Sequence, residues 1–167
     1  MMCSLFHIGL RAADADTTRN FYTRVLGMVL DPSRPNTPVS GYWLRAAVPG
    51  SPPSIHVFTE DDAGLEPWGT NAAGSSGAVD HMSLYCKHYR GVRQMLEETG
   101  LSWQGGAVPG GKQWVIFVYD PNGVMLELNF DATVEGGTMP PLAEENTYLP
   151  GQPYRPFEPA KYGLFAR

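Results

Sequence analysis

The sequence has few charged residues, few cysteines and no long hydrophobic run. Only 17% of its 167 residues are charged and its formal net charge is −5, so it lacks the basic surface with which proteins bind nucleic acid. It contains no run of 18 apolar residues, and we therefore expect no transmembrane helix. Its first residues, MMCSLFHIGL, lack the basic stretch and apolar core of a signal peptide. We expect a cytoplasmic protein that binds neither nucleic acid nor a membrane.

The two cysteines, Cys3 and Cys86, are too few for a framework of disulfide bonds. Each lies in an apolar stretch, where a free cysteine behaves as a small hydrophobic residue. We expect both to be buried free thiols.

Glycine and proline, in contrast, are abundant, with 19 and 15 residues respectively. Disorder would require few apolar residues, whereas 43% of this chain is apolar and 11% is aromatic. The excess of glycine and proline is therefore predicted to separate short strands in a chain whose length suits one domain.

The predicted elements repeat in the same order in the two halves of the chain. In the first half, Asp14 can cap a helix over 14–26 and Gly27 can end it. In the second half, Gly100 follows the predicted helix and the DPNG turn at 120–123 separates the last two strands. Helices are predicted over 14–26 and 89–99, and strands over 5–10, 28–31, 40–47, 54–59, 79–86, 101–105, 113–119 and 124–130. Two β-α-β-β-β modules, joined by a polar linker at 60–77, predict an α+β fold with an eight-stranded mixed sheet.

The tail at 131–167 differs from both modules because it is rich in proline and aromatic residues. Proline alone would suggest an extended tail, but the aromatic side chains indicate that it packs on its own subunit or on a neighbouring one. A lid over a functional site is the alternative.

Three histidines and one glutamate occupy equivalent places in the two modules. His7 and His81 lie in the first strand of their module, and His56 and Glu127 lie in the last. If a pseudo-twofold axis relates the modules, the four side chains converge on that axis. Three imidazoles and a carboxylate are ligands for a divalent transition metal, namely Fe2+, Mn2+, Ni2+, Zn2+ or Co2+. The fourth histidine, His88, is predicted to lie on the surface.

Three stretches resemble the vicinal oxygen chelate superfamily: FHIGLRAADADTTRNFYTRVLGM, DHMSLY and VYDPNGVMLELNF. This superfamily holds the glyoxalase I, methylmalonyl-CoA epimerase, fosfomycin-resistance, extradiol dioxygenase and bleomycin-resistance proteins. The resemblance covers 5–130 and implies one glyoxalase-like domain over 1–130, with modules at about 5–59 and 78–130. It also implies a cup-shaped sheet around a metal and a homodimer, with 131–167 as a C-terminal extension outside the match.

Carried over by position, the resemblance makes His7, His81 and Glu127 the shared metal ligands. His56 supports two mechanisms, because this position holds a fourth ligand in glyoxalase-like members and a catalytic histidine in extradiol dioxygenases. As a ligand, His56 suits proton-transfer isomerisation or lyase chemistry with Glu127 as the base. As an acid–base, it suits a ring-cleaving Fe2+ dioxygenase, in which Tyr119 would replace the tyrosine that such enzymes carry at the position of Phe117.

The third interpretation is a resistance protein that binds a drug or metabolite without chemistry. In every case the resemblance implies a small-molecule substrate or ligand with two adjacent oxygens. Candidate residues for contact with that molecule are Arg11, Arg45 and Lys112 for an anionic group, and Ser83, Tyr85, Gln113 and Phe117 for the lining of the cup.

Overall fold

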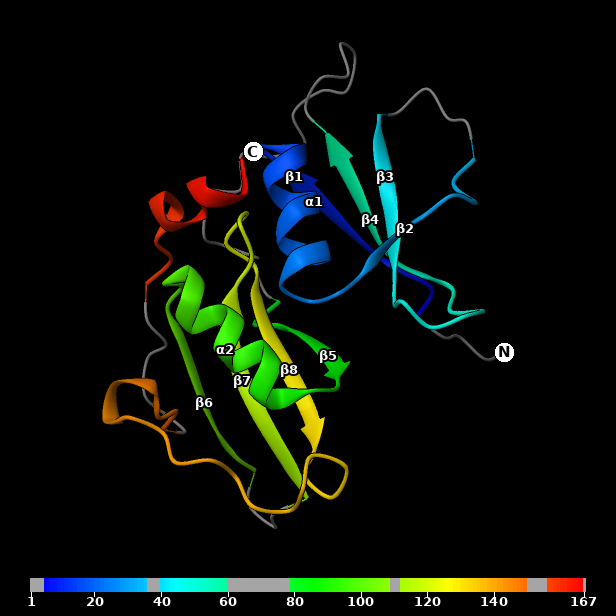
Figure 1. The fold of residues 1–167 in the computed structure, drawn as a ribbon. Coiled ribbons are helices and arrows are strands. Elements are labelled where there is room, and N and C mark those ends of the chain that lie inside the picture. Colours follow the sequence, from blue (N-terminus) through cyan, green and yellow to red (C-terminus); the bar gives the residue numbers. More distant parts are fainter. Residues whose placement is uncertain (1–4, 36–39, 60–78, 109–111, 150–155, 167) are drawn as a thin grey trace. The chain divides into compact units, whose positions relative to one another are not determined.

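The computed structural model describes residues 5–35, 40–59, 79–108, 112–149 and 156–166 (Figure 1). The chain forms two compact units, one of residues 1–70 with 165–167 and one of residues 71–164. Each unit contains one β-α-β-β-β module, so the predicted pair of modules is confirmed. The eight predicted strands all form, four in each of two mixed sheets. The predicted linker at 60–77 lies outside the described residues.

The first unit is a four-stranded sheet with one helix. Its sheet has the order β1-β4-β3-β2, in which β1 runs parallel to β4 and the other neighbours are antiparallel. The elements are β1 (Ile8–Ala12), α1 (Ala15–Arg24), β2 (Val29–Asp31), β3 (Gly41–Arg45) and β4 (Pro53–Thr59). The first predicted strand, 5–10, is shifted to Ile8–Ala12 because it pairs with Ile55–Thr59 of β4.

Helix α1 begins after Asp14, as the sequence predicts, but it ends at Arg24, two residues before the predicted end. The Asp14 side chain accepts a hydrogen bond from the Thr17 N–H at 2.7 Å, and Gly27 has a φ of +64° just after the helix. The apolar face of α1 contributes buried Phe21 and Tyr22, and the sheet contributes buried residues of β1, β3 and β4. Because side chains alternate along a strand, the neighbours of these buried residues lie on the opposite face of the sheet.

The second unit repeats this plan with the order β5-β8-β7-β6, in which β5 runs parallel to β8. Its elements are β5 (Met82–Cys86), α2 (Tyr89–Thr99), β6 (Trp103–Ala107), β7 (Gln113–Tyr119) and β8 (Met125–Asp131). Buried Tyr89 of α2 packs edge-on against Trp114 and Phe130, with ring centroids 5.1 and 5.2 Å away. The core therefore lies on the face of this sheet that α2 covers.

The DPNG turn sets the start of β8. The Asp120 side chain is fully buried, and its Oδ1 accepts hydrogen bonds from the N–H groups of Asn122 and Val124 at 2.9 and 2.8 Å. Gly123 has a φ of +82°, a conformation that favours glycine. This turn fixes where β8 begins and so places Glu127 in the sheet.

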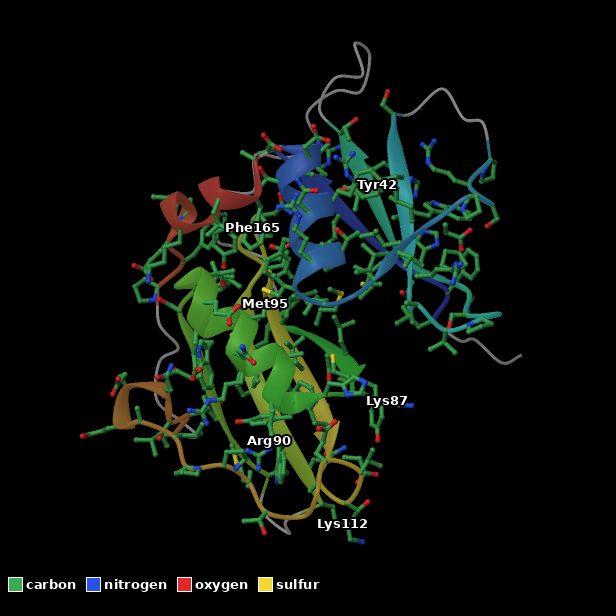
Figure 2. The ribbon with its side chains drawn as sticks, in the orientation of Figure 1. Tyr42, Lys87, Arg90, Met95, Lys112 and Phe165 are labelled. Carbon is green, nitrogen blue, oxygen red and sulfur yellow. The ribbon has the colours of Figure 1, made fainter. Side chains whose placement is uncertain are left out.

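The tail packs on its own chain. After the 3-10 turn η1 (Glu144–Asn146), Thr147 forms a parallel bridge with Gly105 on the edge strand β6. At the end of the tail, η2 (Pro159–Phe165) buries Tyr162, whose hydroxyl donates to the Tyr119 carbonyl at 2.6 Å. Phe165 (Figure 2) belongs to the first unit, where its ring meets that of Phe21 at a centroid distance of 5.8 Å.

Neither helix in the described part of the chain is long and apolar enough to span a membrane.

The N-terminus of α2 is capped by a residue from the tail. His88 is exposed, as predicted, and it has a left-handed φ of +66° and no side-chain capping bond of its own. Instead, the two carboxylate oxygens of Glu135 accept hydrogen bonds from the N–H groups of His88 and Tyr89, at 2.6 and 3.0 Å. A carboxylate at a helix N-terminus satisfies free N–H groups and interacts favourably with the helix dipole.

We predict that Glu135→Ala lowers the free energy of unfolding by about 1 kcal/mol, the usual value of a lost N-cap. Urea denaturation monitored by circular dichroism measures this change. Glu144→Ala, which removes an exposed carboxylate at η1, is the matched control and should leave the unfolding midpoint unchanged. Equal effects of the two substitutions would contradict the capping role.

Cys86, at the end of β5, is a free thiol as predicted, but it is half-buried and not fully buried. Burial raises the pKa of its thiol to about 11, because a low-dielectric environment disfavours the thiolate. The other cysteine, Cys3, lies outside the described residues.

In a Cys3→Ser background, we predict slow alkylation of Cys86 by iodoacetamide at pH 8, because the thiolate is the reactive species. The rate should rise by about tenfold per pH unit up to pH 10, without a plateau near the pKa of an ordinary thiol. Mass spectrometry of timed samples measures the rate. A plateau below pH 10 would show that the thiol is more acidic than its burial implies.

Candidate functional site

In the first unit, the parallel pairing of β1 with β4 brings His7 and His56 together. Gly9 lies opposite His56 in this pairing, and His7 is two residues before Gly9 on the same face. The two imidazole rings are 5.7 Å apart between centroids and nearly perpendicular. Trp43 lies opposite His56 on β3, and its ring is 5.8 Å from that of His56 and 5.9 Å from that of His7. The two histidine rings therefore lie beside the ring of Trp43, on the face of the sheet opposite the core.

Both histidines of this pair have a buried ring nitrogen without a hydrogen-bond partner in the described part of the chain, Nδ1 of His7 and Nε2 of His56. Burial lowers the pKa of His56, and the positive charge of Arg34 and the neighbouring His7 lower it further. His56 is therefore neutral at pH 7, which is the form of histidine that binds a metal. Because buried polar atoms are normally satisfied, these two nitrogens are candidate contacts for a bound ligand or water.

In the second unit, the same pairing of first and last strands brings His81 and Glu127 together. Nε2 of His81 is 3.0 Å from Oε2 of Glu127, and Nδ1 of His81 is 2.7 Å from Oδ1 of Asp80. A carboxylate on one ring nitrogen holds a histidine so that its other nitrogen can bind a metal. Asp80 was missed by the sequence analysis, and its only signal was that it precedes a predicted ligand.

Phe117 and Tyr119 lie on the same face as Glu127. Phe117 is directly opposite Glu127 in the antiparallel pairing of β7 with β8, and its ring meets that of His81 edge-on at 6.2 Å. Burial and the charge of Asp80 raise the pKa of Tyr119. The Tyr119 phenol is therefore protonated at neutral pH and can act as a hydrogen-bond donor.

The residues proposed for contact with the substrate differ in their environments. In the first unit, Arg45 is near Asp31 at 3.7 Å and donates to the Ala46 carbonyl, while Arg11 is exposed. In the second unit, the Ser83 hydroxyl accepts a hydrogen bond from Asn129 at 2.7 Å. Tyr85, Lys112 (Figure 2) and Gln113 are exposed.

The four predicted ligands therefore form two pairs, His7 with His56 in the first unit and His81 with Glu127 in the second. No group of three or more histidine, cysteine, aspartate or glutamate side chains is gathered for metal binding within the described residues. Each pair offers donors that suit a divalent transition metal: two imidazoles with buried ring nitrogens lacking partners in the first unit, and an imidazole with a carboxylate in the second.

Among curated proteins, the chain is 29% identical over 129 residues to the lactoylglutathione lyase of Salmonella typhimurium, covering 74% of this chain and 90% of the relative. It is 27% identical over 129 residues to glyoxylase I 4 of Arabidopsis thaliana, covering 76% of this chain and 70% of the relative.

Solved structures share the fold. A putative glyoxalase family protein from Bacillus anthracis aligns with a TM-score of 0.57 and 21% identity, over 78% of this chain and 97% of that one. A mutant of the fosfomycin resistance protein FosX from Listeria monocytogenes, in complex with Mn(II) and 1S,2S-dihydroxypropylphosphonic acid, aligns with a TM-score of 0.57 and 14% identity. It covers 78% of this chain and 94% of that one.

The model of one protein family matches residues 4–128, which is most of the chain and both modules. The end of β8 and the whole tail, residues 129–167, lie outside this match. The resemblance seen in the sequence is confirmed, and the chain belongs to the Glyoxalase/Bleomycin resistance protein/Dioxygenase superfamily.

Proposed function

We propose that this protein is a metal-dependent enzyme that binds two adjacent oxygens of a small organic substrate and catalyses an isomerisation or lyase reaction by proton transfer. The observation that carries this proposal is the pair of candidate ligands on the same face of each module. One pair has buried ring nitrogens without partners, and the other joins a histidine to a carboxylate at 3.0 Å. The lyase names of the curated relatives agree with this class of reaction.

The residues that would hold the metal are His7, His81 and Glu127, with His56 as a fourth ligand. When bound, a divalent metal supplies Lewis-acid polarisation of the substrate oxygens. Asp80 contributes by accepting the Nδ1–H of His81, which leaves the lone pair of Nε2 available on the side of Glu127. The aromatic rings of Trp43 and Phe58 pack beside His56 and would hold its imidazole in place.

Glu127 is the residue that moves the proton in this proposal. Its carboxylate is one-fifth exposed, so it is partly shielded but can still reach a substrate. A carboxylate placed next to a carbon beside a carbonyl can remove a proton there and return it. Tyr119, whose phenol is protonated at neutral pH like that of any tyrosine, can donate a hydrogen bond to substrate on the same face of the sheet.

The structure favours this chemistry over ring-cleaving oxygenation at one position. Phe117, which stands where such dioxygenases carry a tyrosine, packs its ring against Tyr148 and His81 and provides no hydroxyl. A protein that only binds a drug or metabolite would have no need of Glu127 as a base. Homodimer formation and a cytoplasmic location stay predictions, and light scattering tests the first of them.

We predict that protein purified without chelators contains a divalent transition metal. His7→Ala, His81→Ala and Glu127→Ala should each weaken metal affinity by more than about 100-fold, and Asp80→Ala by about 10- to 100-fold, the range for a residue that orients a ligand. Elemental analysis and calorimetric titration with Ni2+ measure these changes. His88→Ala, which alters the exposed histidine, should leave metal content unchanged. Unchanged metal content in His7→Ala or Glu127→Ala would disprove the shared site.

A second prediction concerns His56. If it is a ligand in a proton-transfer enzyme, His56→Ala should lower metal affinity, and the Fe2+-loaded wild type should show no oxygen uptake with catechol in an oxygen electrode. Retained metal in His56→Ala, together with catechol-dependent oxygen uptake by the wild type, would instead identify His56 as the acid–base of a dioxygenase.

A further inference from the structure

The tail beyond the family match is attached to the second unit by three hydrogen bonds, each to a backbone carbonyl oxygen. The Tyr148 N–H donates to the Gly105 carbonyl at 2.8 Å, and the Asn146 side chain donates to the Trp103 carbonyl at 2.9 Å. Arg93 of α2 donates to the Pro141 carbonyl at 2.9 Å. The first two bonds hold residues 146–148 beside β6, and the third holds Pro141 against α2.

Tyr148 lies on the face that carries His81 and Glu127. Its ring packs on that of Phe117 with a centroid distance of 4.5 Å and an interplanar angle of 38°. Phe117 is in turn the aromatic neighbour of His81 and the cross-strand partner of Glu127. Because Phe117 is only 7% exposed while Tyr148 is half-buried, Tyr148 is the ring that a molecule on this face would meet.

A second tail residue continues this arrangement. The ring of Phe157 lies against that of Tyr119 at 5.6 Å, and Tyr119 is two residues after Phe117 on the same face of β7. The tail therefore places Tyr148 beside Phe117 and Phe157 beside Tyr119. These two tail residues form an aromatic wall.

The charged residues of this sheet indicate which kind of chemical group can bind beside Tyr148 and Phe157. Its strands, Met82–Cys86, Trp103–Ala107, Gln113–Tyr119 and Met125–Asp131, contain no lysine or arginine. Glu127 is negative, and the nearby Ser83 and Asn129 side chains are bonded to each other. An anionic substituent would meet no lysine or arginine within these four strands, whereas a flat, uncharged ring can stack on an aromatic side chain.

We propose that Tyr148, supplied by the C-terminal tail, is a specificity-determining residue that selects substrates with an aromatic substituent next to their two chelating oxygens. This inference rests on the proposed metal-dependent function. It goes beyond it by naming a substrate class and by giving the tail a role in the site.

The test compares two probes that chelate a metal through the same two oxygens, acetohydroxamate with a methyl group and benzohydroxamate with a phenyl group. Calorimetric titration of the Ni2+-loaded full chain should show that benzohydroxamate binds about 3- to 10-fold more tightly, the range expected for one aromatic contact. Tyr148→Ala should abolish this preference and leave the affinity for acetohydroxamate unchanged. Tyr148→Phe, which keeps the ring, should retain the preference.

Leu149→Ala is the matched control, because Leu149 is the next residue and is half exposed; it should bind both probes as the wild type does. An unchanged preference in Tyr148→Ala would overturn the proposal, as would an equal loss of affinity for both probes. If the wild type binds Ni2+ and acetohydroxamate but has no preference for the phenyl group, only this inference fails. If the wild type binds no Ni2+, the proposed function fails with it.

Discussion

The parallel pairing of the first and last strands of each module is the constraint on which the candidate site depends. Because β1 lies beside β4, His7 and His56 become neighbours although most of a module separates them in sequence. The pairing of β5 with β8 does the same for His81 and Glu127. The buried side chains on the opposite face hold the register, since a slip by one residue would turn the ligand residues toward the core.

The two pairs, His7 with His56 and His81 with Glu127, lie in different electrostatic environments. His7 and His56 lie among aromatic rings with buried nitrogens left unsatisfied, which costs stability unless a ligand binds. In the second unit, His81 lies between the carboxylates of Asp80 and Glu127, where its ring nitrogens have partners. A cation would relieve both conditions, because it offers a bond to the unsatisfied nitrogens and neutralises a carboxylate. Both pairs therefore favour the same class of ligand, a cation.

Most of the fold could be predicted because its signals are local. Asp14, Gly27, Gly100 and the DPNG turn act within a few residues, and each has the role expected of it. The repeat of the two modules predicted that His7 would lie near His56 and His81 near Glu127, and both pairs form. Tertiary contacts could not be predicted: Glu135 caps a helix that begins 46 residues earlier, and Tyr148 reaches Phe117 only because its backbone pairs with β6. No local pattern encodes such contacts.

The tail covers part of a sheet edge, and this role also explains why Tyr148 lies on the face that carries Glu127. Strand β6 is at the edge of its sheet, and an uncovered edge exposes unpaired backbone groups to other chains. The bridge from Thr147 and the bond from Tyr148 to Gly105 cover part of this edge, so the segment must run beside β6. Since alternate side chains of such a segment point to opposite faces, covering the edge also places Tyr148 over the face with Glu127. The candidate ligands are thus tied to the sheet, whereas the aromatic side chains Tyr148 and Phe157 can vary with the tail.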